Sequence, residues 1–284
     1  AEQRRIADFL DAETARIDEL LETRKKQAAL LTERDYASIS DTLLPGILTK
    51  NKGTGRFPWL PVPPEDHPLV RLGYICRIQN GLTVDGKRAT TGDVVTRPYL
   101  RVANVQSGRL VLDSVTEITV PRTLAERSTL RVGDVLVTEG GDLDKLGRGT
   151  VWNGELPRCL HQNHVFALRP DKNVLDGHYL ALMTQTLHGR CYFESTGSKT
   201  TNLASTNSSK ILGFPIPLPP LRIQRALVSQ VQENLQQTDE LRTLIDRQVT
   251  LLTERRQSLI TAAVTGQFDV TTASGRNVTE GVAV

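Results

Sequence analysis

Apolar residues recur at heptad spacing in two stretches of the chain, residues 1–45 and residues 221–266. In the first stretch the positions seven or fourteen residues apart are Leu10, Ile17 and Leu31. In the second stretch the same spacing joins Val231, Ile245, Leu252 and Leu259. A narrow apolar stripe that continues over several heptads, with charged residues elsewhere, is typical of a coiled-coil helix. The pattern therefore predicts two long helices, each packed on another helix.

The two stretches are also copies of one another. The sequence of Leu30–Arg34 returns letter for letter as Leu251–Arg255, and the same offset superposes Asp18–Leu20 on Asp239–Leu241. Matching segments of this kind predict one structural unit that is used twice. If a two-fold axis relates the two copies, the helices run antiparallel and form a hairpin.

We expect a second line of contact residues to interleave with the first. Its apolar members would be Ile6, Leu20, Leu227 and Leu241. Polar residues interrupt this predicted line at matching places, namely Glu13, Gln27, Asn234 and Gln248. Polar residues between coiled-coil helices reduce stability but fix the register, so we expect one defined pairing of the helices.

The middle of the chain shows a different pattern, in which short β-like runs alternate with glycine-containing turns. The runs expected to form strands are Tyr99–Val105, Leu110–Leu112, Val115–Val120, Val135–Val137, Val151–Trp152 and Val165–Leu168. One short helix is expected after Asp176, with an inner face formed by Tyr179, Leu180, Met183 and Leu187. The prolines of Pro215–Pro220 exclude a helix until they end.

These patterns predict an α+β fold, in which a mainly-β domain is flanked by two long helices that form an antiparallel coiled coil. The expected segments are a first helix at 1–45, a Gly- and Pro-rich linker at 46–67, the domain at 68–220, a second helix at 221–266 and a disordered tail at 267–284. Aromatic residues of the linker are expected to pack across the entry to the domain. Residue 1 is Ala and aligns with Arg222 in the repeat, so we expect a chain that is cut from a longer parent protein or deliberately trimmed at the start of its first helix.

Composition indicates a cellular compartment and shows that charge is distributed unevenly along the chain. No run approaches the roughly 18 apolar residues that a membrane span needs, so we expect no membrane contact. The three cysteines, an odd number without metal-like spacing, suit a reducing cytoplasm. Residues 46–220 hold 21 Lys and Arg against 15 Asp and Glu, although the net charge of the whole chain is only +3. The surplus favours an anionic partner for the middle domain, and ordinary surface charge explains it equally well.

Motifs for catalysis or cofactor binding are missing from the sequence. Gly197–Thr200 resembles a phosphate loop, but it lacks the adjacent Gly-Lys pair and the earlier glycine that such a loop requires. No Asn-Pro-Pro-Tyr or Asp-Pro-Pro-Tyr motif for amino-group methylation is present. A zinc site is conceivable at Cys159, His161, His164, His188 and Cys191, yet their spacings match no standard pattern and favour packing roles. We therefore expect no catalytic residue, no cofactor and no metal.

Basic and amide residues in the turns of the middle domain are the remaining chemical signal. DNA recognition uses Lys and Arg for phosphates and guanine, and Asn and Gln for adenine. The residues predicted to contact DNA are Lys87, Arg88, Arg101, Asn104, Lys145, Arg148, Lys199 and Asn202. The turn Gln162–His164 offers the same mixture. Taken singly, each residue is better explained as a solvated loop residue, and only the set indicates DNA binding.

Segments throughout the chain resemble the specificity subunits of Type I restriction-modification systems. The segments that carry the resemblance are Glu2–Asp11, Ile17–Leu20, Leu69–Gly81, Gly133–Leu136, Gly197–Leu203, Pro217–Pro220 and Val264–Gly266. The resemblance implies two target-recognition domains, which each read half of a split DNA sequence and are separated by two conserved antiparallel helices. It also implies assembly with DNA methyltransferase (M) and restriction (R) subunits, which carry out the catalysis. This chain differs in having one such domain together with both helices, so it resembles the C-terminal half of such a subunit or a natural half-subunit.

From the residues and the resemblance together we expect a non-catalytic, cytoplasmic specificity subunit that reads a half-site of double-stranded DNA and docks M and R subunits. The alternative is a coiled-coil assembly protein whose middle domain binds another protein. A helix of roughly 40 residues is on the order of 60 Å long, which suits a spacer between DNA half-sites. A homodimer is a further expectation, because two identical domains related by a two-fold axis would read an inverted repeat.

Overall fold

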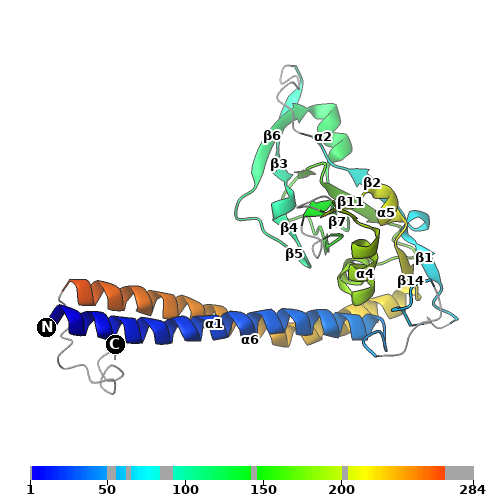
Figure 1. Ribbon diagram of the computed structural model, residues 1–284. Helices are drawn as coiled ribbons and strands as arrows, with labels where there is room; N and C mark the ends of the chain where they lie inside the picture. Colours follow the sequence, from blue (N-terminus) through cyan, green and yellow to red (C-terminus); the bar gives the residue numbers. More distant parts are fainter. Residues whose placement is uncertain are drawn as a thin grey trace. The chain divides into compact units, whose positions relative to one another are not determined.

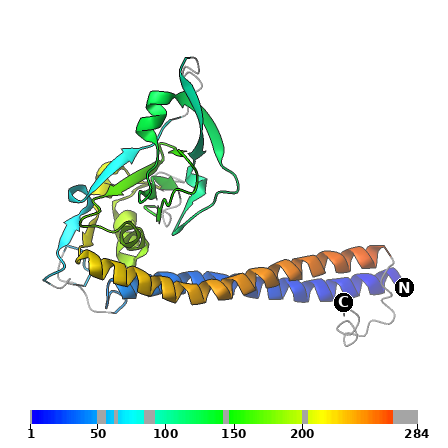
Figure 2. The same ribbon diagram turned by 180° about the vertical axis from the view of Figure 1, so that it is seen from behind.

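Two long helices are the first and the last elements in the described part of the chain. The structure is a computed structural model that describes residues 2–49, 56–61, 65–83, 92–141, 146–199 and 204–265. Helix α1 spans Glu2–Leu43 and helix α6 spans Leu221–Val264, and the two lie side by side in both views (Figures 1 and 2). The predicted α+β fold with two long flanking helices is confirmed. The predicted tail after residue 266 lies outside the described residues.

Local sequence explains where the two helices stop and start. Beyond the end of α1, Gly46 adopts a φ of +85°, which a residue without Cβ adopts readily. At the start of α6, the amides of Ile223 and Gln224 donate to the carbonyl of Pro220 at 2.8 and 3.1 Å. The prolines before Leu221 thus delay the helix, as predicted, and the last of them supplies its first acceptor.

The backbone divides into two compact units, residues 1–35 with 235–284, and residues 36–234. We call the described part of the first unit the hairpin and the second unit the recognition domain. In the hairpin the heptad residues Leu10, Ile17 and Leu31 of α1 are buried or half-buried, as are Ile245, Leu252 and Leu259 of α6. One of the two predicted lines of contact residues is therefore confirmed.

The interleaved line of contact residues is only partly as predicted. Ile6, Glu13 and Leu227 are half-buried, but over the middle of each helix the line was predicted one position too early. Leu20 and Leu241 are 41% and 45% exposed, and Gln27 and Gln248 are exposed as well. The half-buried positions are the next residues along each helix, namely Leu21, Ala28, Arg242 and Val249. Contact residues can alternate at spacings of three then four residues, or of four then three, and both patterns average 3.5 residues. Two consecutive leucines therefore fit either line equally well. The predicted role of these glutamines between the helices is wrong.

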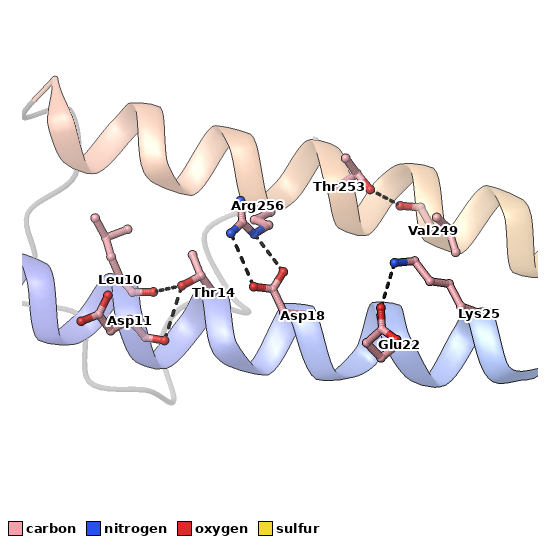
Figure 3. Close-up of polar contacts among 9 residues, drawn as sticks. All are labelled: Leu10, Asp11, Thr14, Asp18, Glu22, Lys25, Val249, Thr253 and Arg256. Atoms are coloured by element: carbon pink, nitrogen blue, oxygen red, sulfur yellow. Dashed lines mark hydrogen bonds and ion pairs between the residues drawn. The ribbon is translucent and has the colours of Figure 1, made fainter.

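Ion pairs join the helices of the hairpin and show their direction. Asp18 accepts from Arg256 at 2.9 Å, and Asp35 accepts from Arg242 at 2.7 Å (the former in Figure 3). As the position on α1 advances, its partner on α6 moves back toward the start of that helix. The helices are therefore antiparallel, and both of these pairs join an aspartate of α1 to an arginine of α6.

The recognition domain is built on two sheets. A four-stranded antiparallel sheet has the order β2-β11-β7-β9, with bounds Cys76–Asn80, Val165–Pro170, Val135–Thr138 and Gly149–Val151. A three-stranded sheet has the order β10-β3-β6, with bounds Leu160–His161, Val94–Leu100 and Thr116–Pro121. Leu100, Leu136 and Trp152 belong to one buried cluster, which draws its members from both sheets and the adjoining loops.

Short elements complete the domain. The helices are α2 Arg122–Ser128, α3 Gly177–Gln185, α4 Leu187–Thr196 and α5 Ser208–Leu212, with 3-10 turns at Leu72–Tyr74 and Val102–Asn104. The minor strands are β1 Leu69–Arg71, β4 Val105–Gln106, β5 Arg109–Leu110, β8 Gly140–Gly141, β12 Ser198–Lys199, β13 Ala204–Ser205 and β14 Pro215–Pro217. Strand β1 pairs with β14, so the segments that enter and leave the domain lie together.

The helix predicted after Asp176 is confirmed as α3, since the Asp176 side chain accepts from the amides of His178 and Tyr179. It ends at Gln185, so Leu187, predicted for its inner face, begins α4 instead. The strand predicted at Tyr99–Val105 is wrong, because β3 already ends at Leu100. There the Asn104 side chain accepts from the Arg101 amide at 2.8 Å and stabilises a 3-10 turn instead. Helices α2, α4 and α5 were not predicted.

An aromatic cluster anchors the described part of the linker to α4. The Trp59 indole donates to His188 Nδ1 at 3.1 Å, and His188 Nε2 donates to the Pro215 carbonyl at 2.7 Å. Burial lowers the pKa of His188 to about 4, which keeps the ring neutral. The ring of Phe57 lies 5.5 Å from that of His188. The aromatic residues of the linker thus pack on the domain as expected.

Candidate nucleic-acid interface

A cavity of about 420 Å³ opens on the recognition domain where four segments of the chain converge. Its walls come from the ends of strands β3, β6 and β10 and from the residues after β2. The lining residues are Thr83, Tyr99, Arg101, Thr116, Ile118, Gln162, Asn163 and His164. Parallel pairing of β10 with β3, in the register Leu160 to Tyr99, brings the turn Gln162–His164 beside Arg101. We call this turn the reading turn.

Backbone hydrogen bonds hold the reading turn from three sides. The amide of Gln162 donates to Leu100 O at 2.8 Å, and the amide of Asn163 donates to Leu82 O at 3.1 Å. On the other side, the carbonyl of His164 accepts from the amide of Glu139 at 2.9 Å. A turn whose backbone is bonded to other segments loses little conformational freedom on binding, so its side chains are presented in a fixed arrangement.

His161 stabilises the reading turn through a buried hydrogen bond of its ring. Its ring is fully buried, and Nδ1 lies 2.7 Å from the carbonyl of Val165, which can only accept. Burial lowers the pKa of His161, so the ring is neutral and carries its proton on Nδ1. The ring therefore closes the loop from residue 161 to residue 165 as a neutral donor.

Gly81 allows the reading turn to approach the neighbouring strand. A Cβ at this position would lie 2.1 Å from the carbonyl oxygen of Gln162 and 2.4 Å from that of His161. Both contacts are with backbone, which cannot rotate away as a side chain can. The close packing of the turn on the end of β2 thus requires glycine at residue 81.

The side chains of the cavity combine one cation with several hydrogen-bonding groups. Arg101 is exposed, and its guanidinium has no ion-pair or hydrogen-bond partner among the described residues. Gln162 Oε1 accepts weakly from the Val102 amide at 3.4 Å, and Asn163 Nδ2 lies 3.4 Å from His164 Nε2. His164 Nδ1 donates to Glu139 Oε2 at 2.6 Å, which fixes the orientation of the imidazole.

The residues predicted to contact DNA are placed very differently by the structure. Arg101 lines the cavity. Asn104 is only 4% exposed, and its amide nitrogen donates to Val111 O and Ser114 O, so its side chain is used inside the domain. Arg148 is half-buried before β9. The side chain of Lys199 in β12 is outside the described residues, as are Lys87, Arg88, Lys145 and Asn202 entirely.

Several residues of the cavity were missed in the sequence. Thr83, Tyr99, Thr116 and Ile118 carry no motif, and they reach the cavity only through the pairing of strands distant in sequence. The turn Gln162–His164 was noticed for its composition, but nothing in the sequence placed it beside Arg101. The contacts among β3, β6 and β10 supply that information.

The candidate zinc ligands do not form a metal site in the described part of the chain, where no three His, Cys, Asp or Glu side chains converge as ligands. Cys159 is buried, which raises its thiol pKa to about 12, and His188 belongs to the aromatic cluster. None of the described helices has a stretch long and apolar enough to cross a membrane.

Comparison with known proteins identifies the domain type that this arrangement resembles. The sequence profile described as Type I restriction modification DNA specificity domain matches residues 64–251, about two thirds of the chain. The MjaX type I restriction enzyme specificity subunit of Methanocaldococcus jannaschii is 23% identical over 199 residues. The StySPI type I restriction enzyme specificity subunit of Salmonella potsdam is 23% identical over 273 residues.

These relatives are longer than the chain. The alignment with the M. jannaschii protein covers 69% of this chain and 45% of the relative, and that with the Salmonella protein covers 94% and 56%. The chain thus spans about half the length of each relative.

Solved structures share the fold of the chain. The HsdS subunit from Thermoanaerobacter tengcongensis aligns over 94% of this chain and 59% of its own, with 22% identity and a TM-score of 0.53. A structure concerned with complex assembly and conformational transition of the type I R-M system aligns over 92% and 58%, with 21% identity and a TM-score of 0.60.

Proposed function

The chain belongs to the Type I restriction modification DNA specificity domain family, and we propose that it reads a half-site of double-stranded DNA while partner subunits carry out the chemistry. The observation that carries the proposal is the cavity in which Arg101 and the reading turn converge. It offers a cation without a partner among the described residues, beside amide and imidazole groups on a rigid backbone. Base-edge recognition in a DNA groove uses this combination.

A salt titration tests the DNA-binding part of the proposal. Phosphate contacts release counterions, so log affinity should fall linearly and steeply with log salt concentration. The alternative function, a middle domain that binds another protein, predicts no DNA affinity even at low salt. Affinity measured by fluorescence anisotropy between about 50 and 200 mM salt separates the two. Absence of binding at the lowest salt would refute the proposed function.

We also propose that one face of the hairpin docks M subunits. Five leucines beside the contact positions between the helices are between 41% and 69% exposed: Leu20, Leu30, Leu241, Leu244 and Leu251. Leu20 corresponds to Leu241, and Leu30 to Leu251, in the sequence repeat. An exposed apolar face of this kind marks an interaction surface.

Geometry brings the leucines of both helices to the same face. A two-fold axis that relates antiparallel neighbours is perpendicular to the plane of their two axes, so matching flanks lie on the same side of the hairpin. Asp18, which pairs with Arg256, lies on the other side of the contact line of α1 from Leu20 and Leu30. An apolar face with internal two-fold symmetry suits two copies of one partner, each contacting the same kind of surface.

Charge substitutions test this docking face. We expect Leu30→Lys combined with Leu251→Lys to prevent co-purification of the M subunit while the helix content is unchanged, because both side chains are already exposed. Leu48→Lys is the matched control, since Leu48 is 50% exposed but lies outside the hairpin. Equal recovery of the M subunit with all variants would exclude this face. Recruitment of R subunits is proposed to follow from the same assembly.

A second copy of the chain is the other partner that we propose. One recognition domain reads one half-site, and two copies related by a two-fold axis would read an inverted repeat. Light scattering of the DNA complex gives the number of chains per duplex. Two chains on an inverted repeat support the pairing, and one chain on the same duplex contradicts it.

A further inference from the structure

We propose that the cavity binds the major-groove edge of a guanine and that Arg101 is the residue that reads it. The inference rests on the proposed DNA-reading function and assigns one base and one side chain within it. Guanine presents two adjacent acceptors, O6 and N7, in the major groove, and the planar fork of an Arg side chain can donate to both.

The state of Arg101 favours this role over a structural one. Among the described residues that line the cavity none is a carboxylate, and the nearby Glu139 is already bonded to His164 at 2.6 Å. The guanidinium is exposed and has no described partner, so all its donors remain available to a ligand. An arginine held on a bonded backbone and left without an anion is suited to an external acceptor.

The other bases fit the lining of the cavity less well. Cytosine presents an amino donor that Glu or Asp accepts, and none of the described lining residues is acidic. Adenine is read by an amide with both its donor and its acceptor available. Gln162 already uses its acceptor on Val102, and Asn163 Nδ2 already lies within 3.4 Å of His164 Nε2. Arg101 is the one Arg or Lys among the described lining residues, and its donors have no described partner.

A fixed turn beside Arg101 makes the reading selective. The amide of Gln162 donates to the carbonyl oxygen of Leu100, the residue before Arg101, at 2.8 Å. This bond joins the reading turn to the backbone next to Arg101. Asn104 Oδ1 accepts from the Arg101 amide at 2.8 Å and fixes the backbone of Arg101 from the other side. A wrong base would therefore leave donors unpaired, because the site cannot shift to meet it.

The substitution Arg101→Lys tests the assignment because it keeps the charge and removes the fork. The whole chain is first used to select its preferred half-site from a randomised duplex pool. Affinities of the parent protein and of the variant are then measured for this half-site and for every single-base change in it. Arg97→Lys is the matched control, because Arg97 is on the same strand β3 but does not line the cavity.

We expect Arg101→Lys to weaken binding to the preferred half-site by on the order of 10- to 100-fold and to abolish the preference for guanine at one position only. Arg97→Lys should keep that preference. A uniform loss on every sequence would show a phosphate contact and overturn the inference. So would unchanged binding, or a loss of preference spread over all positions. A parent protein without any sequence preference would instead refute the proposed function itself.

Discussion

The reading turn and the hairpin are held together in opposite ways. The turn depends on a few contacts, each from a different segment and mostly buried: His161 is fully buried, and Gly81 touches the backbone of Gln162. The hairpin depends on one pattern repeated along two helices, with ion pairs such as Asp18 to Arg256 that are 51% and 39% exposed. A single substitution should therefore have a large effect in the turn and a small effect in the hairpin.

The largest effect is expected from Gly81→Ala. The new Cβ would meet the Gln162 carbonyl oxygen at 2.1 Å, so the reading turn must move away from β2. We expect preferred-site affinity to fall by on the order of 1,000-fold, toward the level of non-specific binding, because specific contacts depend on sub-ångström placement. Competition binding with preferred and scrambled duplexes measures the loss.

Gly73→Ala is the control for that substitution. Its added Cβ would lie 3.4 Å from the nearest atom, Leu212 O, which is an ordinary contact. Gly73→Ala should leave the sequence preference intact. If Gly81→Ala keeps the full preference and a normal melting temperature, the turn is not held as the structure indicates.

The helices illustrate how far the sequence determines a packing arrangement. The repeat and the heptads predicted both helices and their antiparallel direction. The exact contact line could not be predicted, since Leu20 and Leu21 are adjacent and either could lie between the helices.

Some residues of the candidate site could be predicted from their type, but the sequence did not predict that they come together. Composition indicated Arg101 and the turn Gln162–His164. It also indicated Asn104, whose short amide instead bonds to the backbone around it, a use that the sequence does not distinguish from base reading. The cavity arises from parallel pairing of β10 with β3, about sixty residues apart in the chain, and two-residue strands such as β10 carry no periodic signal.

An effect of intermediate size is expected when the pH is lowered. Histidine titration should change the stability of the recognition domain and not that of the hairpin, because all five histidines lie in the recognition domain. Burial lowers the pKa of His188 from 6.5 to about 4. Between these pH values the unfolded chain binds a proton that the folded domain does not, so stability is full above pH 6.5 and decreases as the pH falls. We expect a loss of about 3 kcal/mol by pH 4, measured by urea unfolding at several pH values.

The substitution His188→Phe identifies the source of that loss. The variant keeps a ring in the aromatic cluster but cannot titrate, and it should be less stable at pH 7 because Trp59 and Pro215 lose their partner. Its stability should also change less between pH 6.5 and pH 4 than that of the parent protein. An identical pH dependence in both proteins would show that His188 does not titrate in this range.

The smallest effects are expected in the hairpin. Exposed ion pairs contribute about 0 to 1 kcal/mol, so Arg256→Ala should lower the free energy of unfolding by no more than that. Arg242→Ala should have the larger effect of the two, because Asp35 is only 16% exposed and would lose its partner. Double-mutant cycles with Asp18→Ala and Asp35→Ala measure each pair. A loss of several kcal/mol from Arg256→Ala would contradict the distributed stability that we assign to the hairpin.

Selection from a randomised duplex pool tests the central claim, that a rigid cavity in the recognition domain reads DNA sequence. The whole chain is incubated with the pool at moderate salt, and bound duplexes are recovered and sequenced. We predict that they share one short half-site with a guanine at a fixed position, and that this enrichment disappears with Gly81→Ala. A recovered pool with the same base frequencies as the starting pool, from protein that is folded and binds DNA, would contradict the account.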